Sequence, residues 1–230
     1  INYMDFSQIK VFIPRAGEGK TDIVKHVVAA GGKAKVCKLI EIQQVEPVGV
    51  FSVDIAIVLS SNAVFALDSV RAKKVIAIGK STCNAIGRSS VITPKEFSSE
   101  GLLALDELKN IASKEIIILC GENPRGLLAP ELKARGANVK ELFVYRRIPV
   151  EVGVVDFSDV NVVIFFSVSL LESFVANFAT DMNNWQHIKC IAISNRIAKA
   201  CYKYFSEITV CAVDNLLQGL ENINKEILDE

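Results

Sequence analysis

Short apolar runs alternate along the chain with longer segments whose apolar residues recur at intervals of three and four. The short runs are typical of buried strands, and the longer segments are typical of helices with one apolar face. We predict strands at residues 10–13, 34–42, 55–59, 75–78, 90–92, 116–120, 139–146, 162–166, 190–193 and 208–210. We predict helices at residues 22–30, 62–70, 101–111, 127–135, 170–178 and 195–204. Strands that alternate with helices build parallel sheets covered on both faces, so the pattern predicts an α/β fold.

The two halves of the chain repeat one pattern in the same order. KVFIPRAGE, from Lys10, has the plan of IIILCGENP, from Ile116. DIAIVLSSNAVFAL resembles NVVIFFSVSLLESF, and VIAIGKSTCNAIG resembles CIAISNRIAKACY. One such pair could arise by chance because buried strands look alike, but three pairs in order indicate an internal repeat. The repeat predicts two related α/β units of about a hundred residues each, with a boundary near Ala112.

Small polar residues or glycine follow four of the predicted strands. They are Ser60-Ser61-Asn62, Gly79-Lys80-Ser81-Thr82, Ser167 and Ser194-Asn195-Arg196. In a parallel sheet such residues lie at the carboxyl edge of the strands, where ligands bind. One interpretation is that their hydroxyls and the helix amides form a cleft for carboxylates or phosphates. The other is that Ser, Thr and Asn only cap the following helices. Repetition in both halves favours the cleft.

Charge and composition exclude several classes of protein. The chain has 26 basic and 26 acidic side chains, which argues against a nucleic-acid binder because phosphates require a basic surplus. An apolar fraction of 50% is too high for disorder. The most apolar run, VVIFFSVSLL, is too short to span a membrane, and INYMDFSQ does not resemble a secretory signal. The six cysteines lack metal-binding spacing, so we expect reduced thiols in a cytoplasmic protein.

The chain contains no conventional catalytic motif. PRAGEGKT, at residues 14–21, resembles a phosphate-binding loop because it follows a strand and ends in Gly-Lys-Thr. Its first position requires glycine but is Pro14, which removes an amide donor. Neither G-x-G-x-x-G after the first strand nor G-x-S-x-G is present. The residues alone therefore indicate an α/β protein with an anion-binding cleft.

Motifs along almost the whole chain resemble those of the uroporphyrinogen-III synthase family. IPRA ends the first strand with Arg15, IVLSSNAV spans residues 57–64, and VIAIG precedes Thr82. FSSEGLL covers residues 97–103, IFFSVS covers residues 164–169, and CIAIS covers residues 190–194. The longest motif, LCGENPRGLLAPELKARGANVKELFVYRRIP, resembles the family's glycine turn and its V-Y-x-x-x-P linker. The chain departs from the family at residues 194–197, where SNRI replaces Gly-Pro-Thr-Thr, and at Val168, which replaces a proline.

The resemblance implies a fold of two similar domains with parallel sheets flanked by helices, joined by a two-stranded antiparallel hinge. Domain one would be discontinuous, at residues 1–39 and 150–230, and domain two would be inserted at residues 40–149. The connecting strands would lie near residues 39–43 and 145–149. A hinge of this kind would permit the domains to open and close.

The resemblance also implies a hydro-lyase that uses no cofactor and no metal. Its substrate would be hydroxymethylbilane, a linear tetrapyrrole with eight carboxylates, which loses water and closes with ring D inverted to uroporphyrinogen III. Tyr145 matches the linker tyrosine and would help the hydroxyl to leave, unless it only packs against a strand. Arg146 and Arg147 are weaker candidates. The substrate-binding residues would be Arg15, Ser60, Ser61, Gly79, Thr82, Ser99, Gly101, Gly121, Arg125, Ser167, Ser194 and Arg196.

We further expect a monomer in the cytoplasm that receives its substrate from hydroxymethylbilane synthase and binds neither nucleic acid nor membrane. Two other hypotheses stay open. One is a non-enzymatic two-domain binder of an acidic small molecule. The other is a synthase-like scaffold without activity, which the altered turn at residues 194–197 leaves open.

Overall fold

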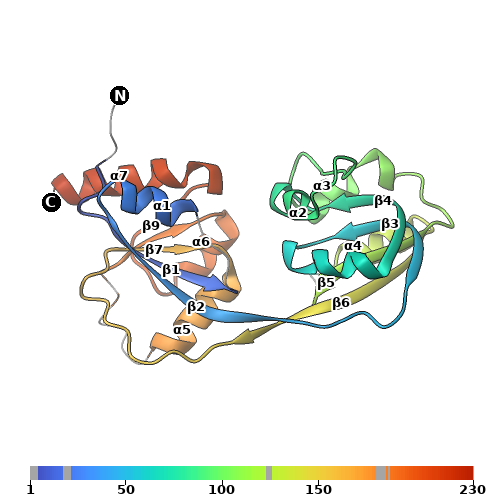
Figure 1. Ribbon diagram of the computed structural model, residues 1–230. Helices are drawn as coiled ribbons and strands as arrows, with labels where there is room; N and C mark the ends of the chain where they lie inside the picture. Colours follow the sequence, from blue (N-terminus) through green and yellow to red (C-terminus); the bar gives the residue numbers. More distant parts are fainter. Residues whose placement is uncertain (1–4, 18–21, 123–125, 180–184, 186, 230) are drawn as a thin grey trace. The chain divides into compact units, whose positions relative to one another are not determined.

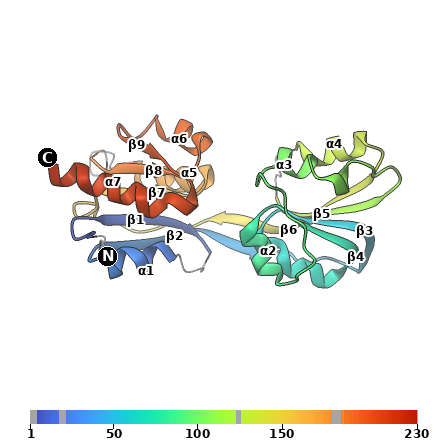
Figure 2. The same cartoon turned by 90° about the horizontal axis from the view of Figure 1, so that it is seen from above.

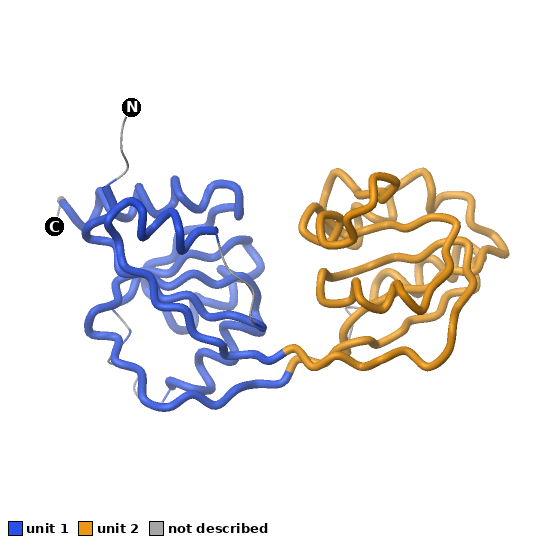
Figure 3. Tube along the Cα trace, in the orientation of Figure 1, with its two compact units in different colours: residues 1–41, 148–230 blue, residues 42–147 orange. Residues whose placement is uncertain are grey.

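Strands and helices alternate through the computed structural model, which describes residues 5–17, 22–122, 126–179, 185 and 187–229. The chain divides into two units (Figure 3). Unit 1 contains Ile1–Glu41 and Ile148–Glu230, and unit 2 contains Ile42–Arg147. The boundary near Ala112 that the repeats alone predict is therefore wrong, because residue 112 lies inside unit 2.

Unit 1 has the strand order β2-β1-β7-β8-β9, and its described strand pairs are parallel. The strands are β1 (Lys10–Ala16), β2 (Lys33–Gln44), β7 (Val162–Phe165), β8 (Lys189–Ala192) and β9 (Ile208–Val210). The helices are α1 (Asp22–Ala29), α5 (Val168–Phe178), α6 (Asn195–Cys201), the 3-10 turn η4 (Val213–Asn215) and α7 (Leu216–Asp229).

The helices of unit 1 cover both faces of its sheet (Figures 1 and 2). Helices α1 and α7 bury Ile23, Val27 and Leu220 against alternate residues of β1 and β7. The opposite face holds a cluster of aromatic rings in which Phe12 of β1 packs edge-on against Phe174 of α5. Successive strand residues point to opposite faces, so each short strand contributes to both cores.

Unit 2 has the strand order β4-β3-β5-β6, and its described pairs are also parallel. The strands are β3 (Phe51–Val58), β4 (Val70–Ala77), β5 (Glu115–Gly121) and β6 (Asn138–Pro149). The helices are η1 (Ser61–Ser69), α2 (Lys80–Ile86), α3 (Ser99–Leu103), η2 (Asp106–Leu108) and α4 (Leu128–Ala134).

The two faces of this second sheet are also both covered. Ile55, Ile57 and their neighbours pack with α3, η2 and α4, whereas Ala56 and Val58 pack with η1 on the other face. The α/β fold class that the sequence predicts, with parallel sheets flanked by helices, is confirmed. No helix in the described part of the chain is long and apolar enough to cross a membrane.

Strands β2 and β6 carry the chain from one unit to the other. On the unit 2 side, the amide of Val45 donates to the carbonyl of Val144 at 2.8 Å. On the unit 1 side, the amide of Val150 donates to the carbonyl of Leu39 at 2.9 Å. Between these two bonds the residue number rises from 39 to 45 in one segment and falls from 150 to 144 in the other, so the two connecting segments run antiparallel.

The internal repeat is confirmed, but it does not coincide with the units. The matched segments are β1 with β5, β3 with β7 and β4 with β8, and these pairs occupy equivalent positions in the two strand orders. Each half of the sequence begins in one unit, crosses on β2 or β6 and ends in the other. Each unit is therefore assembled from both halves.

Several predicted elements are wrong or incomplete. Residues 90–92 form no strand, and only Ile92 makes a bridge, to Ile76. The helix predicted at 101–111 is interrupted because Leu105 has extended backbone between α3 and η2. The helix predicted at 62–70 is the 3-10 helix η1. Helix α7 was not predicted, although its buried residues Leu216, Leu220 and Ile223 have helical spacing.

Candidate functional site

In unit 2, the residues predicted for the site follow the carboxyl ends of neighbouring parallel strands. Ser60 and Ser61 follow β3, Gly79 follows β4, and Gly121 ends β5. Ser60 caps η1, because its Oγ accepts a hydrogen bond from the amide of Asn62 at 3.2 Å. A serine oxygen that accepts from an amide keeps its own hydrogen for a further partner. Capping therefore leaves Ser60 able to donate to a bound carboxylate.

The segment before α3 shows that Ser98, rather than Ser99, makes the functional cap. The Ser98 Oγ accepts from the amide of Gly101 at 3.0 Å. Gly101 itself has a packing role, because a Cβ there would lie 1.9 Å from the backbone carbonyl oxygen of Glu96. Thr82 is buried, with 4% of its surface exposed, in the first turn of α2. Adjacent serines cannot be ranked by sequence, so Ser98 was missed.

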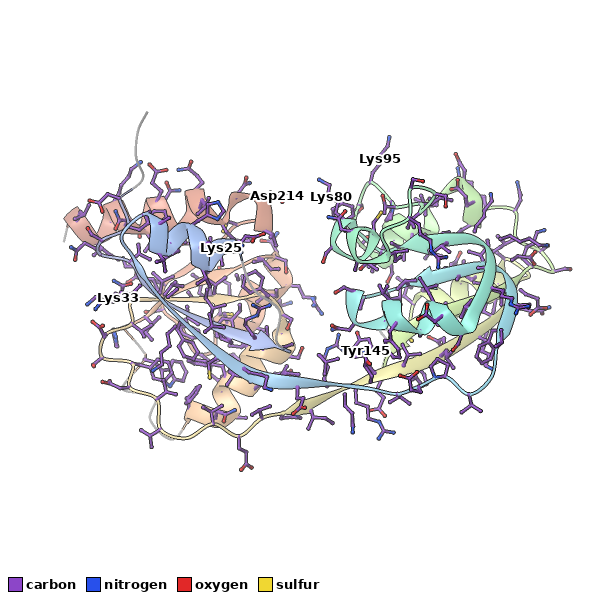
Figure 4. All side chains as sticks on the ribbon, in the orientation of Figure 1. Lys25, Lys33, Lys80, Lys95, Tyr145 and Asp214 are labelled. Carbon is purple, nitrogen blue, oxygen red and sulfur yellow. The ribbon has the colours of Figure 1, made fainter. Side chains whose placement is uncertain are left out.

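Tyr145 lies on β6 beside Gly121, which is its partner in the β5–β6 register. Its side chain, labelled in Figure 4, is buried with 3% of its surface exposed and packs in one core cluster with Ala63, Ala66 and Leu67 of η1. A Cβ at Gly121 would lie 2.6 Å from Cζ, 2.7 Å from Cε2 and 3.0 Å from the hydroxyl of Tyr145. The missing side chain of Gly121 therefore provides the space that the phenol ring occupies.

Arg147 also contacts the Tyr145 side chain. Its guanidinium carbon lies 5.1 Å from the centre of the phenol ring, and its Nη2 donates to the tyrosine hydroxyl at 2.9 Å. A guanidinium group can only donate, so the phenol oxygen is the acceptor in this bond. No acceptor for the hydrogen of the Tyr145 hydroxyl lies among the described residues, so this hydrogen can be donated to a third group.

Arg146 makes a different interaction. Its Nε donates to a carboxylate oxygen of Glu122 at 2.7 Å, and the amide of Glu122 donates to the carbonyl of Tyr145 at 3.0 Å. This ion pair balances the charge of Arg146, whereas Arg147 is directed at the tyrosine. Of the two arginines that the sequence singled out weakly, Arg147 is the one that contacts Tyr145.

A cysteine next to this arrangement is chemically inert. Cys120 precedes Gly121 on β5 and is buried. Burial raises the pKa of its thiol to about 12. A thiol with such a pKa stays protonated near neutral pH, and only the thiolate is a strong nucleophile. Cys120 is therefore not a candidate nucleophile at this position.

In unit 1, the predicted residues also lie at a carboxyl edge. Arg15 is the next-to-last residue of β1, Ser167 follows β7, and Ser194 follows β8. The Oγ of Ser167 accepts from the amide of Leu170 at 3.2 Å, and that of Ser194 accepts from the amide of Ile197 at 3.4 Å. The capping interpretation thus holds in both units.

The two arginines of this edge differ in their surroundings. Partial burial lowers the pKa of the Arg15 guanidinium below its usual value. Arg196 is exposed in the first turn of α6. Arg125, the remaining predicted arginine, lies outside the described residues, as does the second half, residues 18–21, of the segment that resembles a phosphate-binding loop.

The cavities of unit 2 lie at the opposite end of the strands. One, of 390 Å³, is lined by residues that include Lys133 and Asn138, and another, of 500 Å³, by residues that include Asp54 and Arg71. Glu115, the first residue of β5, lines both. Both hollows are wide open to solvent and contain none of the predicted site residues, so we do not assign the site to them. Within the described residues, no three His, Cys, Asp or Glu side chains come close enough to hold a metal ion.

These features define a class of protein: two α/β units, each with capped serines and glycine turns at the carboxyl edge of a parallel sheet, linked by two antiparallel strands. The sequence model of the family described as "Uroporphyrinogen-III synthase HemD" matches residues 21–218. Because this match covers most of the chain, the chain belongs to the uroporphyrinogen-III synthase family.

Relatives and solved structures agree with this assignment. The uroporphyrinogen-III synthase of Escherichia coli (strain K12) is 41% identical over 75 residues, which are 31% of this chain and 30% of the relative. The enzyme of that name from Salmonella typhimurium (strain LT2) is 41% identical over 80 residues, covering 33% and 32%. The matched segments thus span about a third of these curated relatives.

Similarity of fold extends much further than similarity of sequence. The crystal structure of uroporphyrinogen-III synthetase from Helicobacter pylori 26695 matches with a TM-score of 0.64 at 14% identity, covering 94% of this chain and all of that one. A mutant uroporphyrinogen III synthase from Thermus thermophilus matches with a TM-score of 0.59 at 16% identity, covering 96% of this chain and all of that one. At these identities the structures support the fold alone.

Proposed function

We propose that the protein is a uroporphyrinogen-III synthase that converts hydroxymethylbilane into uroporphyrinogen III and one molecule of water. The observation that carries this proposal is the geometry of Tyr145. Its phenol is fixed between Gly121 and Arg147 at a carboxyl edge, with its own hydrogen free to donate. Such a donor can hydrogen-bond to the hydroxyl of the substrate and assist its departure.

The remaining work is conformational. Loss of the hydroxyl leaves a reactive cation that closes to the type I ring if nothing directs it. Attack at the substituted carbon of ring D instead gives a spiro intermediate, which fragments and recloses with ring D inverted. An enzyme favours this route by holding the flexible chain in one geometry. The hydroxyls of Ser60 and Ser167, with Arg15 and Arg196, are suited to hold the substrate carboxylates, whereas the Ser98 hydroxyl already donates to a carboxylate oxygen of Glu96 at 3.1 Å.

Local donors explain how a chain with zero net charge can bind a substrate with eight carboxylates. Hydroxyls and amides bind carboxylates without adding charge, and a few arginines supply cations where they are needed. The same arrangement requires no cofactor, and we propose none.

The test is to supply hydroxymethylbilane and to quantify the type III and type I isomers after oxidation to porphyrins. The proposal predicts type III product with the native protein and type I alone with heat-denatured protein. Type I product alone at every protein concentration would contradict it. A non-enzymatic binder, the second hypothesis, would retain the tetrapyrrole on the protein without changing the isomer ratio. The family assignment disfavours that hypothesis.

We also propose that the protein acts as a cytoplasmic monomer that takes its substrate directly from hydroxymethylbilane synthase. The instability of the linear substrate supports a direct transfer, because free substrate closes to the wrong isomer. Light scattering measures whether the protein is a monomer. Direct transfer predicts that the yield of type III isomer rises when the two enzymes are present in the same mixture, with the activity of each held constant.

A further inference from the structure

Phe97 is a large apolar side chain that unit 2 leaves half exposed. It lies in the segment before α3, and 52% of its surface is accessible. Its side chain packs on Gly79, which lies two residues after the end of β4 and is the N-cap residue of α2. Phe97 therefore belongs to the same carboxyl edge as the site; it is the first residue of the FSSEGLL motif but is not among the predicted substrate-binding residues.

Contact with the Phe97 side chain, rather than the backbone conformation, explains why residue 79 is a glycine. Its φ of −172° is an extended conformation that any residue adopts. A Cβ at Gly79, however, would lie 3.1 Å from Cγ, 3.3 Å from Cβ and 3.4 Å from Cδ1 of Phe97. A side chain there would push the ring away. The glycine therefore lets Phe97 pack close to the strand end while about half of its surface remains exposed.

Two exposed lysines flank the ring in sequence. Lys80 follows Gly79 directly, and Lys95 precedes Phe97 by two residues; Figure 4 shows both reaching outward from unit 2. Among the described residues, neither ammonium group takes part in a hydrogen bond or an ion pair. An exposed aromatic ring with two unpaired lysines close to it in sequence matches a ligand that is both aromatic and anionic.

We infer that Phe97, with Lys80 and Lys95, forms a subsite that binds one carboxylated pyrrole ring of the substrate. The ring stacks on the open face of Phe97, and its acetate or propionate group meets a lysine. β4 and β6 are three strand spacings apart in unit 2, so Phe97 lies about 14 Å from Tyr145 along the edge. A chain of four linked rings extends over such a distance. The subsite thus positions a ring remote from the reacting centre, and this inference rests on the proposed function.

The experiment compares Phe97→Leu and Phe97→Tyr with a matched control, Tyr202→Leu. Tyr202 is an aromatic residue with 67% exposure at the C-terminal end of α6, away from the carboxyl edge. KM and kcat are measured with hydroxymethylbilane, and affinity is measured separately by fluorescence titration with uroporphyrin III, the oxidised form of the product. Thermal unfolding of each variant verifies that it folds.

Loss of an aromatic stack predicts a three- to tenfold rise in KM and a similar loss of uroporphyrin affinity for Phe97→Leu, where about 1.4 kcal/mol corresponds to tenfold. Phe97→Tyr should keep the native KM and the native affinity for uroporphyrin. Lys80→Gln combined with Lys95→Gln should also weaken uroporphyrin binding and should reduce the dependence of that binding on salt. If Phe97→Leu changes KM and uroporphyrin affinity no more than Tyr202→Leu does, the inference is overturned. If the native protein forms no type III product, the proposed function fails, and the titration still decides whether Phe97 binds a carboxylated tetrapyrrole.

Discussion

At the scale of single residues, Tyr145 owes its position to two neighbours of opposite kinds. Gly121 contributes by having no side chain, and Arg147 contributes a hydrogen bond and a cation above the ring. The V-Y motif was enough to single out the tyrosine from the sequence. The roles of Gly121 and Arg147 depend on contacts between β5 and β6 and along β6, which the one-dimensional pattern does not contain.

Tyr145→Phe should lower kcat by about 100-fold, because general acid assistance by a positioned group typically contributes that much or more. The ring and its contacts with Gly121 remain, so the melting temperature should change little. Steady-state kinetics and thermal unfolding measure the two effects. An unchanged kcat would remove Tyr145 from the mechanism and leave it as a packed linker residue.

Gly121→Ala should also lower kcat, because the new Cβ displaces the phenol ring and its hydroxyl. Overpacking of this kind should cost about 1–3 kcal/mol of stability. If the loss of activity acts through Tyr145, it should nearly vanish in the Tyr145→Phe background, as a double-mutant cycle would show. Equal and additive losses in both backgrounds would mean that Gly121 contributes independently of the tyrosine.

At the scale of elements, the sequence predicted the long apolar strands well and the short helices poorly. Strands such as β5 are buried on both faces, so their apolar runs are unbroken. The region after β4 was harder to predict, because α2 and α3 are short and are separated by irregular chain. Ser98, which caps α3 and is not among the predicted site residues, falls in this region, where element boundaries depend on tertiary packing.

Asp54 ties three strands of unit 2 together at their amino ends. Its carboxylate accepts from Nζ of Lys73 on β4 at 2.8 Å and from the amide of Glu115 on β5 at 3.0 Å. These hydrogen bonds, that of Lys73 first, lower the pKa of Asp54 below its usual 3.8. The folded state then holds fewer protons on this group than the unfolded state does, so its contribution to stability is lost as the pH falls.

Asp54→Asn should therefore destabilise the protein at neutral pH, and its difference from the native protein should shrink as the pH falls from about 4 through the lowered pKa. Urea unfolding at a series of pH values measures this difference. Asp106→Asn is the matched control, because Asp106 pairs with Lys109, three residues along the same segment, and links no strands. A difference between native protein and Asp54→Asn that stays constant down to about pH 2 would refute the assignment.

At the scale of the whole molecule, the chain builds two units by exchanging strands between its sequence halves. Unit 1 takes β1 from the first half and β7 and β8 from the second, and unit 2 takes β3 and β4 from the first half and β5 from the second. A repeat search compares the halves in order and therefore finds the repeat but misplaces the boundary. Only the pairing of β2 and β6 shows where the chain crosses.

Each unit buries its own core, so a defect in unit 2 should not affect a probe in unit 1. Gly101→Ala introduces a Cβ 1.9 Å from a backbone oxygen and should destabilise unit 2 by about 2 kcal/mol or more. Trp185, the single tryptophan, packs against Phe174 and Phe205 in unit 1. In thermal unfolding of Gly101→Ala, circular dichroism should show a transition at a lower temperature than in the native protein, whereas the transition seen by Trp185 fluorescence should not move.

Gly153→Ala is the control for that experiment, since nothing in the described part of the chain lies within 4 Å of a Cβ at Gly153. It should shift neither signal. If the fluorescence transition of Gly101→Ala moves together with the circular dichroism, the units unfold as one cooperative body, and the independence of the two cores is disproved.

The most direct test of the central claim is the isomer ratio of the product as a function of enzyme concentration. Spontaneous closure to type I competes with directed closure on the enzyme. The fraction of type III should therefore rise toward one as the native protein is increased, and Tyr145→Phe should require about 100-fold more protein for the same fraction. A product that remains type I throughout the series, with the protein shown to be folded, would contradict the account.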